Sequence, residues 1–144
     1  MNVVGSRFNE SKDDFSIVAS HNGYEKRFGY IHTRSIKILK KEDKIFGTDE
    51  LKKTKNYPNL LNYFVRFHIY PNTKVVKTMA RNSVLISLSN GEGWSLFSET
   101  NNFEIEKNIF LGNKNKIINN ESVCISGGIE KEIILIKWIN ERVS

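Results

Sequence analysis

The stretch SIVASHNGYEKRFGYIHTRSIKIL, residues 16–39, decides the fold because strand-like sequence lies on both sides of a turn signal. β-Branched and aromatic residues mix with polar ones on each side, and Asn22-Gly23 between them favours a reversal of the chain. We therefore expect strands over residues 14–21 and 30–40, joined by a turn at Asn22-Gly23.

Runs of the same kind recur along the rest of the chain at intervals of roughly 8–12 residues, which is typical of an antiparallel sandwich or barrel. No convincing amphipathic helix interrupts them. We predict an all-β fold: an antiparallel β-sandwich of about ten strands, forming a single domain over residues 1–144. The expected strands are 14–21, 30–40, 44–51, 61–70, 74–79, 83–88, 94–99, 103–107, 121–126 and 131–141.

Two turn signals and one apolar run add detail to this prediction. Asn90-Gly91 lies between two apolar runs, which is a strong hairpin signal. Gly127-Gly128 is expected to make a similar turn. The run IILIKWIN, residues 133–140, is apolar on both faces apart from Lys137, which predicts a central strand.

The strand predicted over residues 61–70 has two different faces, because successive side chains of a strand point to opposite sides. One face carries Tyr63, Val65, Phe67 and Ile69, and the other carries Phe64, Arg66, His68 and Tyr70. The second face is aromatic and cationic. It suits an anionic sugar chain, and it suits a domain interface equally well.

Composition narrows the classes of partner. The net charge of +6, from 22 basic and 16 acidic residues, favours an acidic partner such as nucleic acid, an anionic polysaccharide or a membrane surface. The lysines are scattered, however, and an AT-rich genome explains them equally well. We find no nucleic-acid-binding motif and no apolar run of about 20 residues, so we expect neither a nucleic-acid nor a membrane partner.

The first residues contain no apolar segment of the kind found in signal peptides. The chain as it stands is therefore expected in the cytoplasm, and in the periplasm if it is part of an exported protein. The one cysteine, Cys124, excludes an intramolecular disulfide and a cysteine-based zinc site.

The sequence offers few groups for catalysis. His21, His32 and His68 are its only histidines, and no metal-binding spacing, nucleophile motif or phosphate-binding glycine loop accompanies them. We therefore expect no metal and no cofactor. His21 and Tyr24 could transfer protons if suitably tuned. Alternatively, they hydrogen-bond within the turn and hold two strands in register, while Arg34 pairs with a carboxylate such as Asp49.

Several segments, taken in order, resemble the C-terminal β-sheet domain of the heparinase II/III-like polysaccharide lyases. They are GSRF (5–8), ASHNGYEKRFGYIHTRSIKIL (19–39), IFGTDEL (45–51), VRFHIYP (65–71), VLISLSNGEGW (84–94), IEKNIFLG (105–112) and IKWINERV (136–143). Asn22 stands where the family more often has Asp.

The resemblance implies a supersandwich-type β-domain. In complete relatives an N-terminal helical α/α toroid precedes this domain, and the toroid is absent from residues 1–144. The family's catalytic Tyr and Asn or His lie on the toroid, and a further His lies on an earlier β-strand. None of these positions matches this sequence, so we assign no catalytic residue.

The resemblance also implies β-elimination on a polysaccharide that contains uronic acid. Our first hypothesis is a β-domain that is inactive without a toroid, which another chain would supply; a homo-oligomer is an alternative assembly. The second is a stand-alone module that binds an anionic glycan, and the third is a small complete lyase using His21 and Tyr24. Whether this chain is itself an enzyme is left open. The candidate substrate-binding residues are His21, Tyr24, His32, Arg34, Arg66 and His68.

Overall fold

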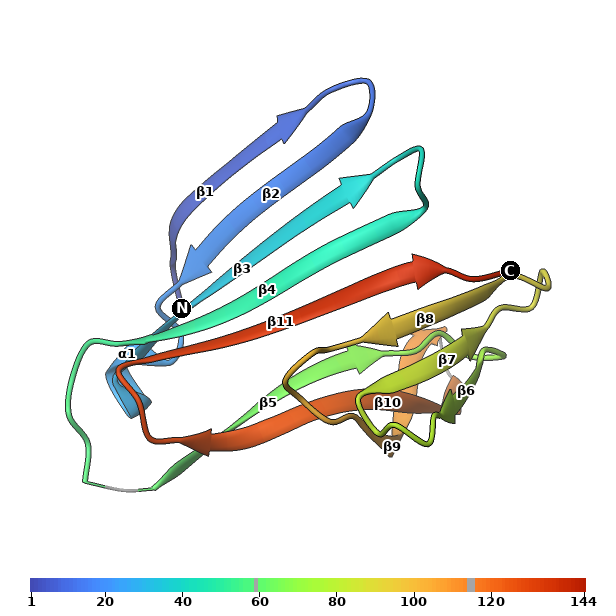
Figure 1. Cartoon of the computed structure of the whole chain (residues 1–144). Helices are drawn as coiled ribbons and strands as arrows, with labels where there is room; N and C mark the ends of the chain where they lie inside the picture. Colours follow the sequence, from blue (N-terminus) through green and yellow to red (C-terminus); the bar gives the residue numbers. More distant parts are fainter. Residues whose placement is uncertain (59, 114–115) are drawn as a thin grey trace.

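The computed structural model describes residues 1–58, 60–113 and 116–144, and these form two antiparallel β-sheets (Figure 1). The elements are β1 (Val3–Glu10), β2 (Asp14–His21), α1 (Glu25–Phe28), β3 (Tyr30–Leu39), β4 (Lys44–Lys53), β5 (Leu61–His68), β6 (Lys74–Lys77), β7 (Ser83–Ser87), β8 (Gly93–Phe97), β9 (Glu104–Asn113), β10 (Lys116–Ile129) and β11 (Ile133–Arg142). No helix in the described ranges is long and apolar enough to cross a membrane.

The two sheets differ greatly in width. The large sheet has eight strands in the order β1-β2-β3-β4-β11-β8-β7-β6, and the small sheet has three in the order β5-β10-β9. The small sheet lies beneath one part of the large sheet, while β1 and β2 extend beyond it (Figure 1). The inner face of β1 and β2 therefore has no second layer of described residues over it.

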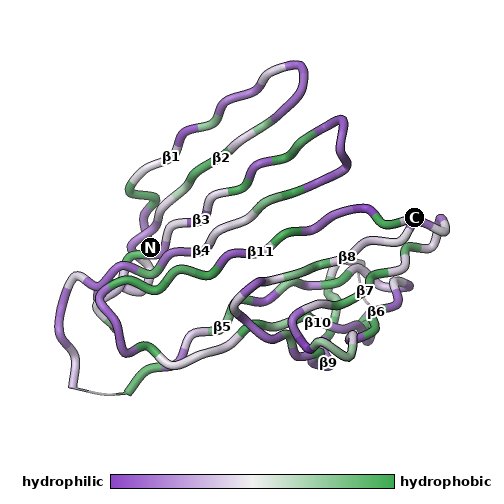
Figure 2. The backbone as a smooth tube through the Cα atoms, in the orientation of Figure 1, coloured by the Kyte–Doolittle hydropathy of each residue, from purple (hydrophilic) through white to green (hydrophobic). Residues whose placement is uncertain are grey.

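The core lies where the two sheets face each other. Its most deeply buried side chains come from β7, β8 and β11 on one side, from β10 on the other and from the segment before β9: Val84, Leu96, Ile136, Val123, Ile125 and Phe103. Figure 2 shows hydrophobic segments in this region and polar tips on the β1–β2 and β3–β4 hairpins.

An apolar row continues from the core onto the uncovered part of the large sheet. Ile36 of β3 packs against the core, and strand register places Ile17 of β2 and Phe8 of β1 beside it in turn. The exposed fraction is 36% for Ile17 and 73% for Phe8. The core is therefore open towards the β1 edge.

All ten predicted strands are present, and the predicted all-β fold is confirmed. β11 is a central strand between β4 and β8, as its apolar sequence predicted. β1 was not predicted, because its residues VVGSRFNE lack alternation and every one of them is exposed. β10 is longer than predicted, and its additional first residues, KIINN, are mostly exposed.

Two turn predictions had different outcomes. The Asn90-Gly91 turn joins β7 to β8, and Gly91 has a φ of 89°. The turn predicted at Gly127-Gly128 is wrong, because both glycines lie inside β10 and pair with β5. The ring of Tyr63 lies where a Cβ of Gly127 would be, so Gly127 permits close packing instead of a turn.

Gly47 has a similar role beneath Trp138. A Cβ at Gly47 would lie within 2.0 Å of two indole atoms, so the indole can lie flat against β4 only because residue 47 is glycine. We predict that Gly47→Ala lowers the free energy of unfolding by about 1–3 kcal/mol through overpacking. Urea denaturation followed by tryptophan fluorescence would measure it.

Gly5→Ala is the matched control, because no atom lies within 4 Å of the position of its Cβ. We expect that variant to unfold at the same urea concentration as the parent. Equal stability of the two variants would contradict the packing of Trp138 on Gly47.

Candidate functional site

The candidate site is built around one buried carboxylate, that of Asp49. Asp49 lies on β4 between Arg34 of β3 and Ile136 of β11, all three with side chains on the inner face of the large sheet. Its side chain is 1% exposed. A carboxylate in such a place is stable only if hydrogen-bond donors surround it.

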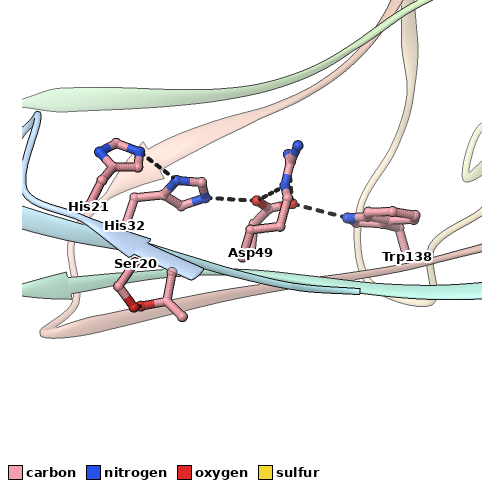
Figure 3. A network of polar contacts seen from close by, with 7 residues as sticks. Ser20, His21, His32, Asp49 and Trp138 are labelled. Carbon is pink, nitrogen blue, oxygen red and sulfur yellow. Dashed lines mark hydrogen bonds and ion pairs between the residues drawn. The ribbon is translucent and has the colours of Figure 1, made fainter. Parts of the chain in front are cut away.

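Three side chains supply those donors. Oδ1 of Asp49 accepts from Nε2 of His32 and Nε of Arg34, both at 2.7 Å. Oδ2 accepts from Nη2 of Arg34 at 3.1 Å and from Nε1 of Trp138 at 3.0 Å (Figure 3). The pairing of Arg34 with Asp49 that the sequence predicted is confirmed, and it is bidentate.

These hydrogen bonds keep Asp49 ionised. Burial alone would raise the pKa of Asp49, but the hydrogen bonds from His32, Arg34 and Trp138 outweigh it and hold that pKa below its ordinary value.

The network continues from His32 to His21. Nε2 of His21 lies 3.0 Å from Nδ1 of His32, and the backbone N–H of Gly23 donates to Nδ1 of His21 at 3.1 Å (Figure 3). Because Nδ1 of His21 accepts, its proton lies on Nε2 and is donated to His32. The proton of His32 then lies on its own Nε2 and is donated to Asp49. Both imidazoles are thus satisfied in their neutral forms.

The connection between β2 and β3 differs from the predicted tight turn at Asn22-Gly23. The reversal spans residues 22–29 and includes α1, and the residue with positive φ is Gly29, at 78°. A Cβ at Gly29 would lie 2.6 Å from the carbonyl oxygen of Lys55. Tyr57 fixes the connection further, because its hydroxyl donates to the carbonyl of Lys26 at 2.8 Å.

A pocket of about 440 Å³ lies between this network and the small sheet. His21, Tyr24, His32, Arg34 and Asp49 line it from the large sheet and its connection. Further lining residues include Phe28 and, from β5, Tyr63, Phe64 and Arg66. The wall is therefore aromatic, with two guanidinium groups and one carboxylate.

Five of the six candidate residues line this pocket: His21, Tyr24, His32, Arg34 and Arg66. The ring of Tyr24 contacts that of His21, with centroids 5.2 Å apart. Arg66 has an ion pair with Glu106 at 2.9 Å and its guanidinium lies over the ring of Phe64.

His68 lies elsewhere, on the outer face of the small sheet. Its Nδ1 accepts from Ser122 and Asn108, each at 3.1 Å. The structure does not bring His68 to the residues around Asp49.

Sequence reasoning missed Trp138, Phe28 and Tyr63 as members of the site. Trp138 was assigned only to a central strand, and nothing local in the sequence links it to Asp49, 89 residues away. A signal did exist for Tyr63, since Gly127 on the paired strand leaves room for its ring.

The side chains around the pocket are better placed to bind a ligand than to transfer protons. Both ring nitrogens of His21 are engaged, so neither is free to accept a proton from a ligand unless the network opens. No group of three potential metal ligands occurs among the described residues. The geometry favours the interpretation of His21 and His32 as residues that hold neighbouring strands in register.

Comparison with known proteins identifies the family. The family profile described as "Heparinase II/III-like, C-terminal" matches residues 3–139, so the chain belongs to this family. A search of curated protein sequences found no significant match.

Solved structures support the same fold. The heparan sulfate lyase HepC from Pedobacter heparinus is similar with a TM-score of 0.77 and 14% identity over 98% of this chain. A structure of heparinase III is similar with a TM-score of 0.63 and 14% identity over 96% of this chain. The chain covers 22% and 21% of the lengths of those two structures.

We predict that Asp49→Asn lowers the free energy of unfolding by about 3–5 kcal/mol, because it removes the charge that compensates a partly buried guanidinium. Glu106→Gln is the matched control, since it removes an exposed ion pair and should cost less than about 1 kcal/mol. Chemical denaturation would measure both values. A smaller loss for Asp49→Asn than for Glu106→Gln would refute the central role of Asp49.

We also predict that acid destabilises the fold through His21. Burial lowers the pKa of His21, and the charge of the N-terminal amine and any proton added to His32 lower it further. The folded state therefore binds the proton less readily than the unfolded state, whose His has a pKa of about 6.5. The contribution of neutral His21 to the free energy of unfolding is therefore complete above about pH 6.5. It is lost as the pH falls through the pKa that His21 has in the folded state.

The urea concentration at the midpoint of unfolding is measured at several pH values from about 7 to about 5. The midpoint should fall for the parent and for His68→Gln, and it should fall less for His21→Gln. An equal decrease in all three proteins would show that His21 is not the group responsible.

Proposed function

We propose that this chain is the glycan-binding β-domain of a heparinase II/III-like polysaccharide lyase. In this proposal it binds a polysaccharide containing uronic acid, and groups outside residues 1–144 carry out β-elimination. The observation that supports it best is the pocket beside Asp49, because its lining has more hydrogen-bond donors and positive charge than acceptors.

The side-chain donors of the pocket favour an anion. Arg34 pairs with Asp49, and Arg66, whose charge is paired with Glu106, borders the pocket from the edge strand β5. Both oxygens of Asp49 are already occupied by His32, Arg34 and Trp138, so they present little acceptor capacity to a ligand. Nη1 of Arg34 has no hydrogen-bond partner among the described residues, and the Arg34 side chain is 38% exposed. A carboxylate or sulfate group can therefore be bound there.

The backbone of β5 adds further donors. The N–H of Ile69 donates to the carbonyl of Glu121 on β10, so odd-numbered residues of β5 direct their backbone groups to β10. Even-numbered residues, including Phe64 and Arg66, direct theirs to the free edge of the strand. Both residues line the pocket, and their N–H groups are available to sugar oxygens.

The chemistry itself requires more than this pocket supplies. β-Elimination needs a group that neutralises the carboxylate at C5, a base that removes the C5 proton and an acid that protonates the leaving O4. Arg34 is suited to the first role. The geometry offers no free base, since His21 and His32 use both ring nitrogens. The base and acid are therefore assigned to a toroid domain outside residues 1–144.

The experiment described next also distinguishes two other functions. The aromatic side chains around the pocket, among them Tyr24 and Phe64, also suit a stand-alone module that binds an anionic glycan without any lyase partner. A small complete lyase would use His21 and Tyr24, which lie side by side at the pocket.

The experiment incubates the purified chain with heparan sulfate and with alginate. Binding is measured by calorimetry, and elimination by the ultraviolet absorbance of unsaturated products. We predict binding without elimination, and a loss of affinity of about tenfold or more for Arg66→Gln, because a charge-assisted hydrogen bond contributes about 1.5–3 kcal/mol. Lys137→Gln is the control, since Lys137 is exposed on the outer face of β11 and loses the same charge.

Equal weakening by Arg66→Gln and Lys137→Gln would indicate non-specific attraction and contradict a pocket site. Product formed by the chain alone, and abolished by His21→Ala in a variant that remains folded, would establish the small complete lyase instead.

A further inference from the structure

We propose that two copies of this chain associate through β1, with the two β1 strands pairing antiparallel across a two-fold axis at Phe8. The proposal does not depend on the sugar chemistry above. It follows from the free edges of the sheets, because an uncovered strand edge presents backbone donors and acceptors that template pairing with another strand.

The four outer strands of the two sheets are β1, β6, β5 and β9, and each of the last three has a feature that limits pairing with a second copy. β6 has only four residues and carries a lysine at each end. β5 borders the pocket that Arg34 and Asp49 line. β9 is tied to β6 by the ion pair between Lys77 and Glu104 at 2.7 Å. Short strands and lysines are features that block edge pairing.

β1 lacks this protection along most of its length. It has eight residues without proline, and all of them are exposed. A register shift occurs between Val3 and Gly5, and from Gly5 to Glu10 the pairing with β2 is regular. The second copy would meet a straight edge of six residues there.

The hydrogen-bond pattern shows which groups of β1 are free. Ser11 N–H donates to the carbonyl of Asp14, so these two residues are a hydrogen-bonded pair. Such pairs alternate along antiparallel strands, so Asn9, Arg7 and Gly5 also direct their backbone groups to β2. The intervening residues, Ser6, Phe8 and Glu10, therefore direct their N–H and C=O groups to the free edge. Two copies can pair only when these even-numbered residues lie opposite one another.

Side-chain charges select among the registers that satisfy this condition. When Phe8 lies opposite Phe8 of the partner subunit, Ser6 faces Glu10 of the partner subunit and Arg7 faces Asn9 of the partner subunit. A shift that places Ser6 opposite the partner's Phe8 would set Arg7 against the partner's Arg7, and like charges directly opposite destabilise a sheet. The opposite shift would shorten the ladder.

The selected register also covers apolar surface. The side chain of Phe8 is on the inner face beside Ile17, where the core is open, and both are exposed in the single chain. Pairing brings two Phe8 rings together as a cross-strand aromatic pair, the kind of contact that stabilises strand pairs. β1 is the outer strand of the large sheet, and no other strand lies beyond it (Figure 1).

The test compares proline variants at adjacent positions by sedimentation equilibrium. The mass of the parent chain should rise from 16.7 kDa towards twice that value as concentration increases. Ser6→Pro removes an N–H at the free edge, so this variant should fold normally and remain monomeric. Arg7→Pro removes an N–H that bonds to β2 and should instead detach β1, which hydrogen exchange would detect. A parent chain that stays monomeric, or a Ser6→Pro variant that dimerises equally well, would overturn the proposal.

Cysteine cross-linking gives a second measurement, independent of how proline affects folding. In the selected register the Cα atoms at position 8 of the two copies are about 5.5 Å apart, within the range of a disulfide. Phe8→Cys should therefore form a disulfide-linked dimer with oxidised glutathione as the oxidant. Arg7→Cys should not, because each Arg7 lies opposite Asn9 of the partner subunit. Failure of Phe8→Cys to cross-link, or equal cross-linking by both variants, would exclude this register.

Binding of heparan sulfate serves as the control that separates the two proposals. Ser6 and Phe8 lie outside the pocket, so Ser6→Pro should leave glycan affinity unchanged whether or not the chain dimerises.

Discussion

The burial of the Asp49 carboxylate is the constraint on which the rest of the site depends. An ionised group with 1% exposure must be surrounded by donors, and here they come from β3 and β11, the two strands that flank β4. Arg34, His32 and Trp138 are held in fixed orientations as a result. His32 in turn orients His21, and the N–H of Gly23 completes the chain of hydrogen bonds. One carboxylate on β4 thus fixes the positions of side chains from three other strands, β2, β3 and β11.

The unequal width of the two sheets places this network beside a pocket. Where the small sheet covers the large one, the interior is a dry core around Ile136 and Val123. At the edge of β5 the small sheet ends, and the polar network on β3 and β4 borders a pocket instead of the core. Beyond it, β2 and β1 have an uncovered inner face. The same asymmetry therefore places a pocket at one margin of the core and an open strand edge at the far side.

Much of this fold could be predicted from the sequence, since ten strands, the central position of β11 and the ion pair between Arg34 and Asp49 follow from local patterns and from family resemblance. β1 could not be predicted, because it buries no side chain and so has no alternation to detect. The glycines at 127 and 128 were misinterpreted because glycine is required both in turns and where an aromatic ring packs on a strand. The place of Trp138 in the site depends on strand pairing over long separations, which local sequence does not encode.

Asp49 thus fixes His32 and His21 as hydrogen-bonded structural residues. The most direct measurement is nitrogen NMR of the two imidazoles at neutral pH, which distinguishes protons on Nδ1 from protons on Nε2. Both rings should carry their proton on Nε2, and Asp49→Asn should alter the signals of both. A proton on Nδ1 of His21, or signals that Asp49→Asn leaves unchanged, would contradict it.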